Sequence, residues 1–194
     1  MSLLNKMTRQ EQKQQTRNNI VSTAERLFRS QGFDQISTRQ IAKECGIAVG
    51  TVFAHFPDIN ALTQAIYHQK LTHRLAILFE SLAEDSDGLT RFLAYAKTLY
   101  ELYDEDRAFS KFLLKSAMFD LSYFQQQMDE FLLQIAEKLE ANMPRNNHEQ
   151  RYIVAKSFFG FYMFNLLRGL EDTQTSPNDW LALLEIDCRQ LLTI

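Results

Sequence analysis

Apolar residues recur at helical spacing along most of the chain and divide it into amphipathic segments. In the first segment, residues 17–29, Ile20, Ala24, Leu27 and Phe28 share one face of a helix. Polar residues occupy the opposite face, so the pattern predicts a helix that packs one side against a core.

Small and capping residues mark where the next two helices begin and end. Gly32 is expected to end the first helix, because glycine adopts the positive φ of helix C-termini without strain. Residues 37–40 read Ser-Thr-Arg-Gln, the pattern of a capping box, and predict a short helix at 38–45. Gly46 can take the left-handed turn that precedes a third helix at about 49–55. Two short helices joined in this way form a helix-turn-helix, whose second helix enters the major groove of DNA.

The rest of the chain predicts further helices. Amphipathic segments are expected at 59–82, 89–103, 108–115, 121–141, 149–170 and, after a capping serine at 176, up to residue 192. The first of these is long enough to link the N-terminal helices mechanically to the body, which is the set of helices that follow. Ile66 is expected to face the N-terminal helices and Phe79 to face the body. Residues 158–167 are apolar on nearly every face of their helix, which must then be covered on all sides. We therefore expect an all-α protein.

Composition agrees with this prediction and adds an uneven charge. The 194 residues include only three prolines and six glycines, and 45% are hydrophobic, which suffices for a sizeable core. The net charge is −3, yet residues 1–56 hold eight Lys and Arg against four Asp and Glu, and the remainder holds thirteen against twenty. Residues 1–56 thus carry a net charge of +4 and residues 57–194 a net charge of −7. This difference suggests that the N-terminal part binds a polyanion and that the rest of the chain does not.

Several classes of protein receive little support. No apolar run reaches membrane-spanning length and the N-terminus is polar, so a soluble cytoplasmic protein is expected. Cys45 and Cys188 each lie in a helical segment and are expected to be reduced, buried thiols. The four histidines have no metal-ligand spacing with the cysteines, and the chain has neither a glycine-rich phosphate loop nor a nucleophile turn. We expect no catalytic residues, no metal and no cofactor.

The third predicted helix has residue types that fit contact with nucleic acid. Gly50 lies in its first turn, where a missing side chain lets the backbone approach DNA closely. Thr51 and His55 are four residues apart and share a face, turned away from Val52 and Phe56. The first pair can therefore face DNA while the second pair packs inward.

A longer pattern of spaced residues extends through about residues 15–65. It comprises Arg17, Ile20, Thr23, Ala24, Leu27, Phe28, Gly32, Phe33, Ile41, Ala42, Cys45, Gly46, Ile47, Gly50, Thr51, Val52, Phe53, His55, Phe56 and Leu62. This pattern resembles the DNA-binding domain of the tetracycline-repressor (TetR) family of bacterial transcriptional regulators. The resemblance implies an N-terminal arm and helix-turn-helix domain at 1–57, and a helical effector-binding and dimerisation domain at 58–194 in which helix 58–83 is the link.

The resemblance also implies which residues meet DNA. These are Arg17, Ser37, Thr38, Arg39, Ala48, Val49, Gly50, Thr51, Phe53 and His55. The chain departs from the family at Phe53, where a tyrosine is usual, and at Ile59, where a lysine is common. Phe53 is expected to keep the core packing and lose the hydroxyl. Because phosphate contacts supply much of the affinity, we expect weaker or less salt-sensitive binding unless a basic N-terminal arm compensates. The basic residues of that arm are Lys6, Arg9, Lys13 and Arg17.

In the body, the resemblance implies a pocket for a small-molecule effector. A mostly apolar site with a few polar anchors is expected among Tyr95, Leu99, Tyr103, Phe112, Phe119, Tyr123, Met128, Phe158 and Tyr162. Repression relieved by a hydrophobic or aromatic ligand is the favoured function. The alternative is a regulator without an effector, whose body only dimerises or recruits a protein.

The last two helices are expected to pair with those of a second copy. The two helix-turn-helix domains of such a dimer would bind a pseudo-palindromic operator of double-stranded DNA. The expected interface residues are Phe161, Phe164, Trp180, Leu184 and Cys188. Gly160 would permit close helix approach at this interface or beside the pocket. The expected partners are therefore DNA, an effector and a second copy of the chain, and not a membrane.

Overall fold

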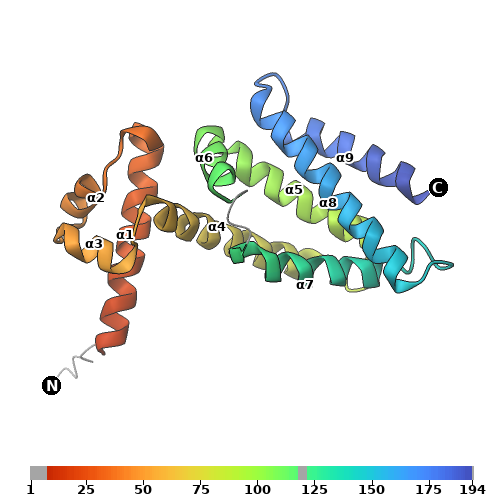
Figure 1. Cartoon of the computed structure of the whole chain (residues 1–194), viewed down its shortest axis with the longest axis horizontal. Coiled ribbons are helices and arrows are strands. Elements are labelled where there is room, and N and C mark those ends of the chain that lie inside the picture. The colour runs from red at the N-terminus through yellow and green to blue at the C-terminus, as the bar shows by residue number, and fades with distance from the viewer. Residues whose placement is uncertain (1–7, 118–121, 194) are drawn as a thin grey trace. The chain divides into compact units, whose positions relative to one another are not determined.

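The structure is a computed structural model that describes residues 8–117 and 122–193, and its regular elements in those ranges are all helical. The α-helices are α1 (Arg9–Gln31), α2 (Thr38–Cys45), α3 (Val49–His55), α4 (Ile59–Ser81), α5 (Gly88–Asp104), α6 (Arg107–Ala117), α7 (Ser122–Lys138), α8 (His148–Glu171) and α9 (Pro177–Leu192) (Figure 1). A 3₁₀ helix, Phe33–Gln35, follows α1. The all-α prediction is confirmed. Within the described ranges, no helix combines the length and the apolar character needed to cross a membrane.

The chain forms two compact units that divide within α4, between Gln69 and Lys70. The buried side chains of α4 all precede this division and are Leu62, Thr63, Ile66 and Tyr67. After the division Phe79 is exposed to solvent, so the expectation that it faces the body is wrong. The proposed boundary after residue 57 would assign the whole of α4 to the second domain and stays a prediction.

In the N-terminal unit α2 packs on α1 and α3 packs on α2. Two glycines make the turns, with φ of 86° at Gly32 and 67° at Gly46. Ser37 caps α2 by accepting a hydrogen bond from the backbone N–H of Gln40 (3.2 Å). The predicted capping box is incomplete, because the amide of Gln40 donates instead to Gln31 Oε1 (2.8 Å).

The two cysteines are free thiols in different surroundings. Cys188 is fully buried, as the sequence predicts. Cys45 is only half-buried, because it lies at the last residue of α2 with its Sγ 3.8 Å from the backbone carbonyl of Asn19. The prediction of burial is therefore wrong for Cys45.

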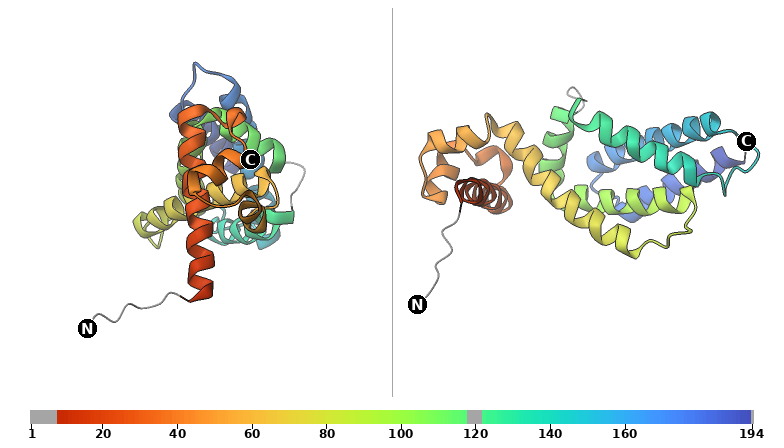
Figure 2. Two further views of the ribbon diagram at one scale, coloured as in Figure 1. Left: turned by 90° about the vertical axis from the view of Figure 1, so that its left-hand side faces the viewer. Right: turned by 90° about the horizontal axis from the view of Figure 1, so that it is seen from below.

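The C-terminal unit is a bundle in which α8 packs on α7 and α9, and α5 packs on the same two helices (Figure 2). Its core combines leucines and other aliphatic residues with stacked aromatic rings. Tyr95 stacks on Phe131 with ring centroids 4.1 Å apart, and Tyr100 stacks on Tyr162 at 5.0 Å. The Tyr100 hydroxyl donates to the backbone carbonyl of Tyr162 (3.0 Å), which satisfies this polar group in the interior.

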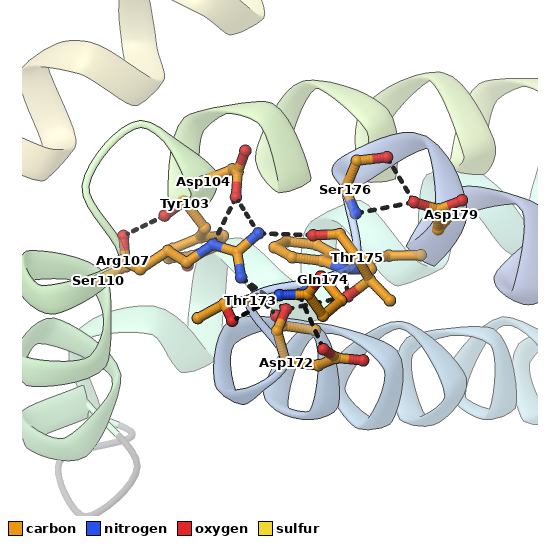
Figure 3. A network of polar contacts seen from close by, with 12 residues as sticks. Tyr103, Asp104, Arg107, Ser110, Asp172, Thr173, Gln174, Thr175, Ser176 and Asp179 are labelled. Carbon is orange, nitrogen blue, oxygen red and sulfur yellow. Dashed lines mark hydrogen bonds and ion pairs between the residues drawn. The ribbon is translucent and has the colours of Figure 1, made fainter.

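Arg107, the first residue of α6, ties that helix to the end of α8 (Figure 3). Its guanidinium donates to Asp104 Oδ1 (2.7 Å) and to the backbone carbonyls of Gly169 (3.2 Å), Asp172 (2.7 Å) and Thr175 (2.7 Å). The carbonyls at a helix C-terminus have no partner within the helix, and a cation also complements the helix dipole there. Arg107 therefore stabilises the turn from α8 to α9.

The close approach of α8 to α9 depends on Gly169. A Cβ atom at this position would lie 2.1 Å from Cε2 of Trp180, so only glycine leaves room for the indole. The indole N–H donates to Thr175 Oγ1 (2.9 Å), and the guanidinium of Arg107 lies 5.2 Å from the ring centroid. Trp180 is thus built into the core of the single chain.

Candidate nucleic-acid interface

Helix α3 presents one face to solvent and packs the other against the core of the N-terminal unit. Val52 and Phe56 are almost fully buried, whereas Gly50 is exposed and Thr51 and His55 are half-buried. A Cβ atom added at Gly50 would meet no atom within 4 Å, so the backbone of the first turn of α3 lies open. The predicted division between inward and outward faces of α3 is therefore found.

Phe53 departs from the expected packing, since 49% of its surface is exposed. It follows Val52 directly, and a step of one residue rotates a side chain by about 100° around the helix, away from the core. The expectation that Phe53 is a core residue is wrong. An exposed aromatic ring on this face offers apolar contact instead, for example to the methyl group of thymine.

The start of α2 and the residue before α3 supply the other predicted contacts. Arg39 and Ala48 are exposed, and Thr38 and Val49 are half-buried. The hydroxyl oxygen of Ser37 accepts the hydrogen bond that caps α2. Ala48 occupies the N-cap position of α3 and forms no side-chain hydrogen bond there. No side chain caps the first turn of α3, and the backbone N–H of Thr51 donates to the carbonyl of Ala48 (2.9 Å).

Arg17 has a structural role that the sequence did not reveal. Its Nη1 donates to the backbone carbonyl of His55 (2.9 Å), and its guanidinium lies 4.1 Å from the centroid of the Phe56 ring. The side chain is half-buried and closes the C-terminal end of α3. A hydrogen bond to DNA from Arg17 would have to come from its remaining donors, and this contact stays a prediction.

α1 begins at Arg9, eight residues earlier than the predicted start at residue 17. Thr8 and Glu11 form a capping box, in which Glu11 Oε2 accepts from the Thr8 N–H (2.6 Å) and Thr8 Oγ1 accepts from the Glu11 N–H (3.2 Å). The first fully buried residue of α1 is Ile20, so the preceding turns form without an apolar side chain in the core. The apolar pattern missed them for this reason, although residues 8–11, Thr-Arg-Gln-Glu, match the capping-box pattern.

These first turns of α1 flank α3 and form two grooves with it. One groove is lined by Arg9, Gln10, Gln12, Lys13, Thr16, Thr51 and His55. The other is lined by Gln10, Lys13, Gln14, Arg17, Ala54 and His55. Lys13 and His55 border both grooves, so basic side chains of α1 lie next to the outward face of α3.

The neighbours of His55 change the pKa of its imidazole. Its partial burial lowers the pKa of the imidazole below the usual 6.5, and the positive charges of Lys13 and Arg17 lower the pKa further. The imidazole is therefore neutral at neutral pH and can donate one N–H to a phosphate.

The predicted effector residues contribute mainly to the packed interior of the second unit. Leu99, Tyr103, Phe158 and Tyr162 are buried, whereas Tyr95, Phe112 and Met128 are half-buried. Phe119 and the side chain of Tyr123 lie outside the described residues. Burial raises the pKa of Tyr95 to about 12, so its hydroxyl stays protonated and can act as a hydrogen-bond donor.

The predicted dimer residues divide into two groups. Trp180, Leu184 and Cys188 are buried within one chain and present no surface to a second copy, so their assignment to the interface is wrong. An apolar stripe predicts that a helix face is covered but not which chain covers it, and here α5 and α8 of the same chain pack on α9. Phe161 is half-buried and Phe164 is 59% exposed. The other large apolar residues exposed on α8 and α9, which the sequence analysis did not assign to the interface, are Ile153, Leu167, Leu183 and Ile186.

Comparison with known proteins relates the N-terminal unit to one family. Residues 20–66 match the family model described as bacterial regulatory proteins, tetR family. The HTH-type transcriptional regulator UidR of Escherichia coli K12 is 39% identical over 67 residues, which cover 34% of this chain and 34% of UidR. The matched stretch is therefore about a third of the length of this curated relative.

Solved structures are similar over nearly the whole chain. The TetR-family repressor FadR of Thermus thermophilus, solved with lauroyl-CoA, has a TM-score of 0.71 at 18% identity over 91% of this chain and 93% of FadR. RolR, solved with resorcinol, has a TM-score of 0.66 at 20% identity over 95% of this chain and 96% of RolR. At these identities the likeness shows the fold.

Proposed function

Because the chain carries a TetR-family DNA-binding domain within the all-helical fold of that family, we propose that it is a sequence-specific transcriptional repressor. The outward face of α3 is the observation that carries this proposal. Gly50 opens the backbone, Thr51 and Phe53 offer a hydroxyl and an apolar ring to base edges, and the buried anchors Val52 and Phe56 hold the helix in place.

The repressor acts as a homodimer that joins its copies through α8 and α9. Ile153, Gly160, Phe164 and Leu167 follow each other at spacings of seven, four and three, which puts all four on one exposed face of α8. Leu183 and Ile186 add exposed apolar surface on α9. Neighbouring exposed apolar residues of this size mark protein interfaces in soluble proteins. A two-fold axis at this face sets two recognition helices on one operator.

Release from DNA is governed by a hydrophobic or aromatic small molecule bound in the second unit. Two proteins of the same fold were solved with such ligands, an acyl-CoA thioester in FadR and a phenol in RolR. The aromatic side chains of α5, α7 and α8 and the protonated hydroxyl of Tyr95 suit ligands of this kind. The ligand binds the DNA-incompetent form more tightly and so lowers operator affinity.

Selection of DNA from a random-sequence duplex library tests the DNA-binding part. We expect enrichment of a pseudo-palindrome whose half-sites are about one helical turn, or 10 base pairs, apart or a multiple of that distance. Thr51→Ala should change or relax the base preference within each half-site while leaving the fold intact. A library without enriched sequence after repeated rounds would contradict sequence-specific binding.

Titration of the complex of protein and selected duplex with acyl-CoA thioesters and with phenols tests the effector part. A ligand of either class is expected to dissociate the complex, and Tyr95→Phe should weaken the response without changing ligand-free DNA affinity. If DNA affinity stays constant over both classes, the alternative of a regulator without an effector gains support.

A further inference from the structure

The helical extension at the start of α1, residues 9–15, has only exposed side chains and yet is held by local interactions. The capping box at Thr8 fixes its first turn, and the amide of Gln14 donates to Asn18 Oδ1 (2.8 Å) one turn before the core begins. A polar helix end without packing is marginal in water, so local hydrogen bonds alone explain how it forms and not what it does. Figures 1 and 2 show these turns running on past α2 and α3.

The extension carries its positive charges on one side. Arg9, Lys13 and Arg17 are spaced by four residues and share a helix face, while Glu11 lies on the opposite side with its carboxylate bound to the Thr8 N–H. Arg9 and Lys13 are exposed and form no ion pair with another described residue. Both line the groove that also contains Thr51 and His55 of α3.

Arg17 fixes the position of this basic face. It binds the last carbonyl of α3 and the Phe56 ring, so α1 cannot rotate freely relative to the recognition helix. α3 itself contains no lysine or arginine. Any lysine or arginine contact beside its outward face must therefore come from another element, and the extension of α1 lines two grooves with α3.

We propose that the first two turns of α1 form a second DNA-contacting element, in which Arg9 and Lys13 bind phosphates of the strand that borders the major groove occupied by α3. The occupant is DNA because the groove is continuous with the recognition face and its free charges are positive. This inference rests on the proposed function. The contacts add affinity and salt dependence and leave base selectivity to α3.

The test is a salt series of fluorescence anisotropy with the full chain on two probes, a duplex selected from a random library and a scrambled duplex. Each phosphate contact contributes about 0.9 to the slope of log K against log salt, so one lost contact per protomer lowers the slope of a dimer by about 1.8. We expect this loss for Arg9→Gln and for Lys13→Gln, on both duplexes, with an unchanged ratio of the two affinities. Lys13→Arg should retain the wild-type slope.

Arg29→Gln is the matched control, because it removes the same charge from the same helix, about 24 Å along its axis from Lys13 and about 30 Å from Arg9. Its side chain lies near Glu25, and we expect wild-type binding. If both α1 variants bind with wild-type affinity and slope while the wild type selects its duplex, the inference fails and the proposed function stands. If the wild type does not select any duplex, both fail.

Discussion

Replacing Gly160 with leucine separates the stability of one chain from the stability of the dimer. Gly160 lies in the middle of the exposed face of α8, and a Cβ atom built there meets no atom of the same chain within 4 Å. Glycine inside a helix costs about 1 kcal/mol relative to alanine, and leucine is nearly as favourable as alanine. Within one chain, Gly160→Leu should therefore stabilise α8 by somewhat under 1 kcal/mol, an estimate from helix propensity.

The same substitution should weaken the proposed dimer. Overpacking a well-fitted apolar contact costs about 1–3 kcal/mol, and a two-fold interface receives the new side chain twice. The expected loss of about 2–6 kcal/mol raises the dimer dissociation constant by at least about 30-fold. The opposite signs of the two effects distinguish a surface glycine kept for assembly from one kept for folding.

Sedimentation velocity over a concentration series measures the dissociation constant, and far-UV circular dichroism confirms that helix content is retained. Glu137→Leu is the matched control, because it adds the same side chain at an exposed position of α7. We expect the control to dimerise like the wild type. A Gly160→Leu protein with the wild-type dissociation constant would refute the assignment of this α8 face to the interface.

Three further outcomes follow from local geometry. Gly169→Ala forces its Cβ atom into the Trp180 ring, and we expect the free energy of unfolding to fall by about 1–3 kcal/mol. Thermal unfolding should show this as a lower melting temperature, and an unchanged melting temperature would contradict the close packing of α8 on α9. In the native protein at pH 8, iodoacetamide should modify Cys45 and spare Cys188, because Cys188 is fully buried and burial raises the pKa of its thiol to about 12. Mass spectrometry measures the labelling of each cysteine, and equal labelling would contradict the burial of Cys188. Operator affinity should rise as the pH falls below neutral, because a phosphate favours the charged form of His55 and so raises, in the complex, a pKa that burial and the cations Lys13 and Arg17 lower in the free protein. The operator affinity of His55→Gln, measured by anisotropy, should lose this pH dependence, and a wild type without it would contradict the contact.

The sequence predicted the helix-turn-helix accurately because its signals are local. The left-handed glycine at 46 and the capping serine at 37 determine the ends of α2 through their own backbone and side-chain chemistry. The first turns of α1 were missed because their helix has no apolar stripe, and only the weaker capping-box pattern at residues 8–11 marks them.

Tertiary packing explains the errors at single positions. Trp180 and Leu184 lie on the apolar face of α9, and periodicity shows that this face is covered but not whether its own chain or a second copy covers it. Phe53 was assigned to the core because its residue type is apolar, whereas its angular position on α3 points it outward. The role of Arg17 depends on a contact across 38 residues of sequence, which no local pattern encodes.

The central claim, that two copies of the chain read one DNA sequence through α3, is tested most directly by binding stoichiometry and selectivity together. Fluorescence anisotropy should be measured on a labelled library-selected duplex and on a scrambled duplex of equal composition, at physiological salt and without effector. The account predicts saturation at two protomers per selected duplex, with affinity at least about 10³-fold above that for the scrambled duplex. Equal affinity for the two duplexes would contradict it.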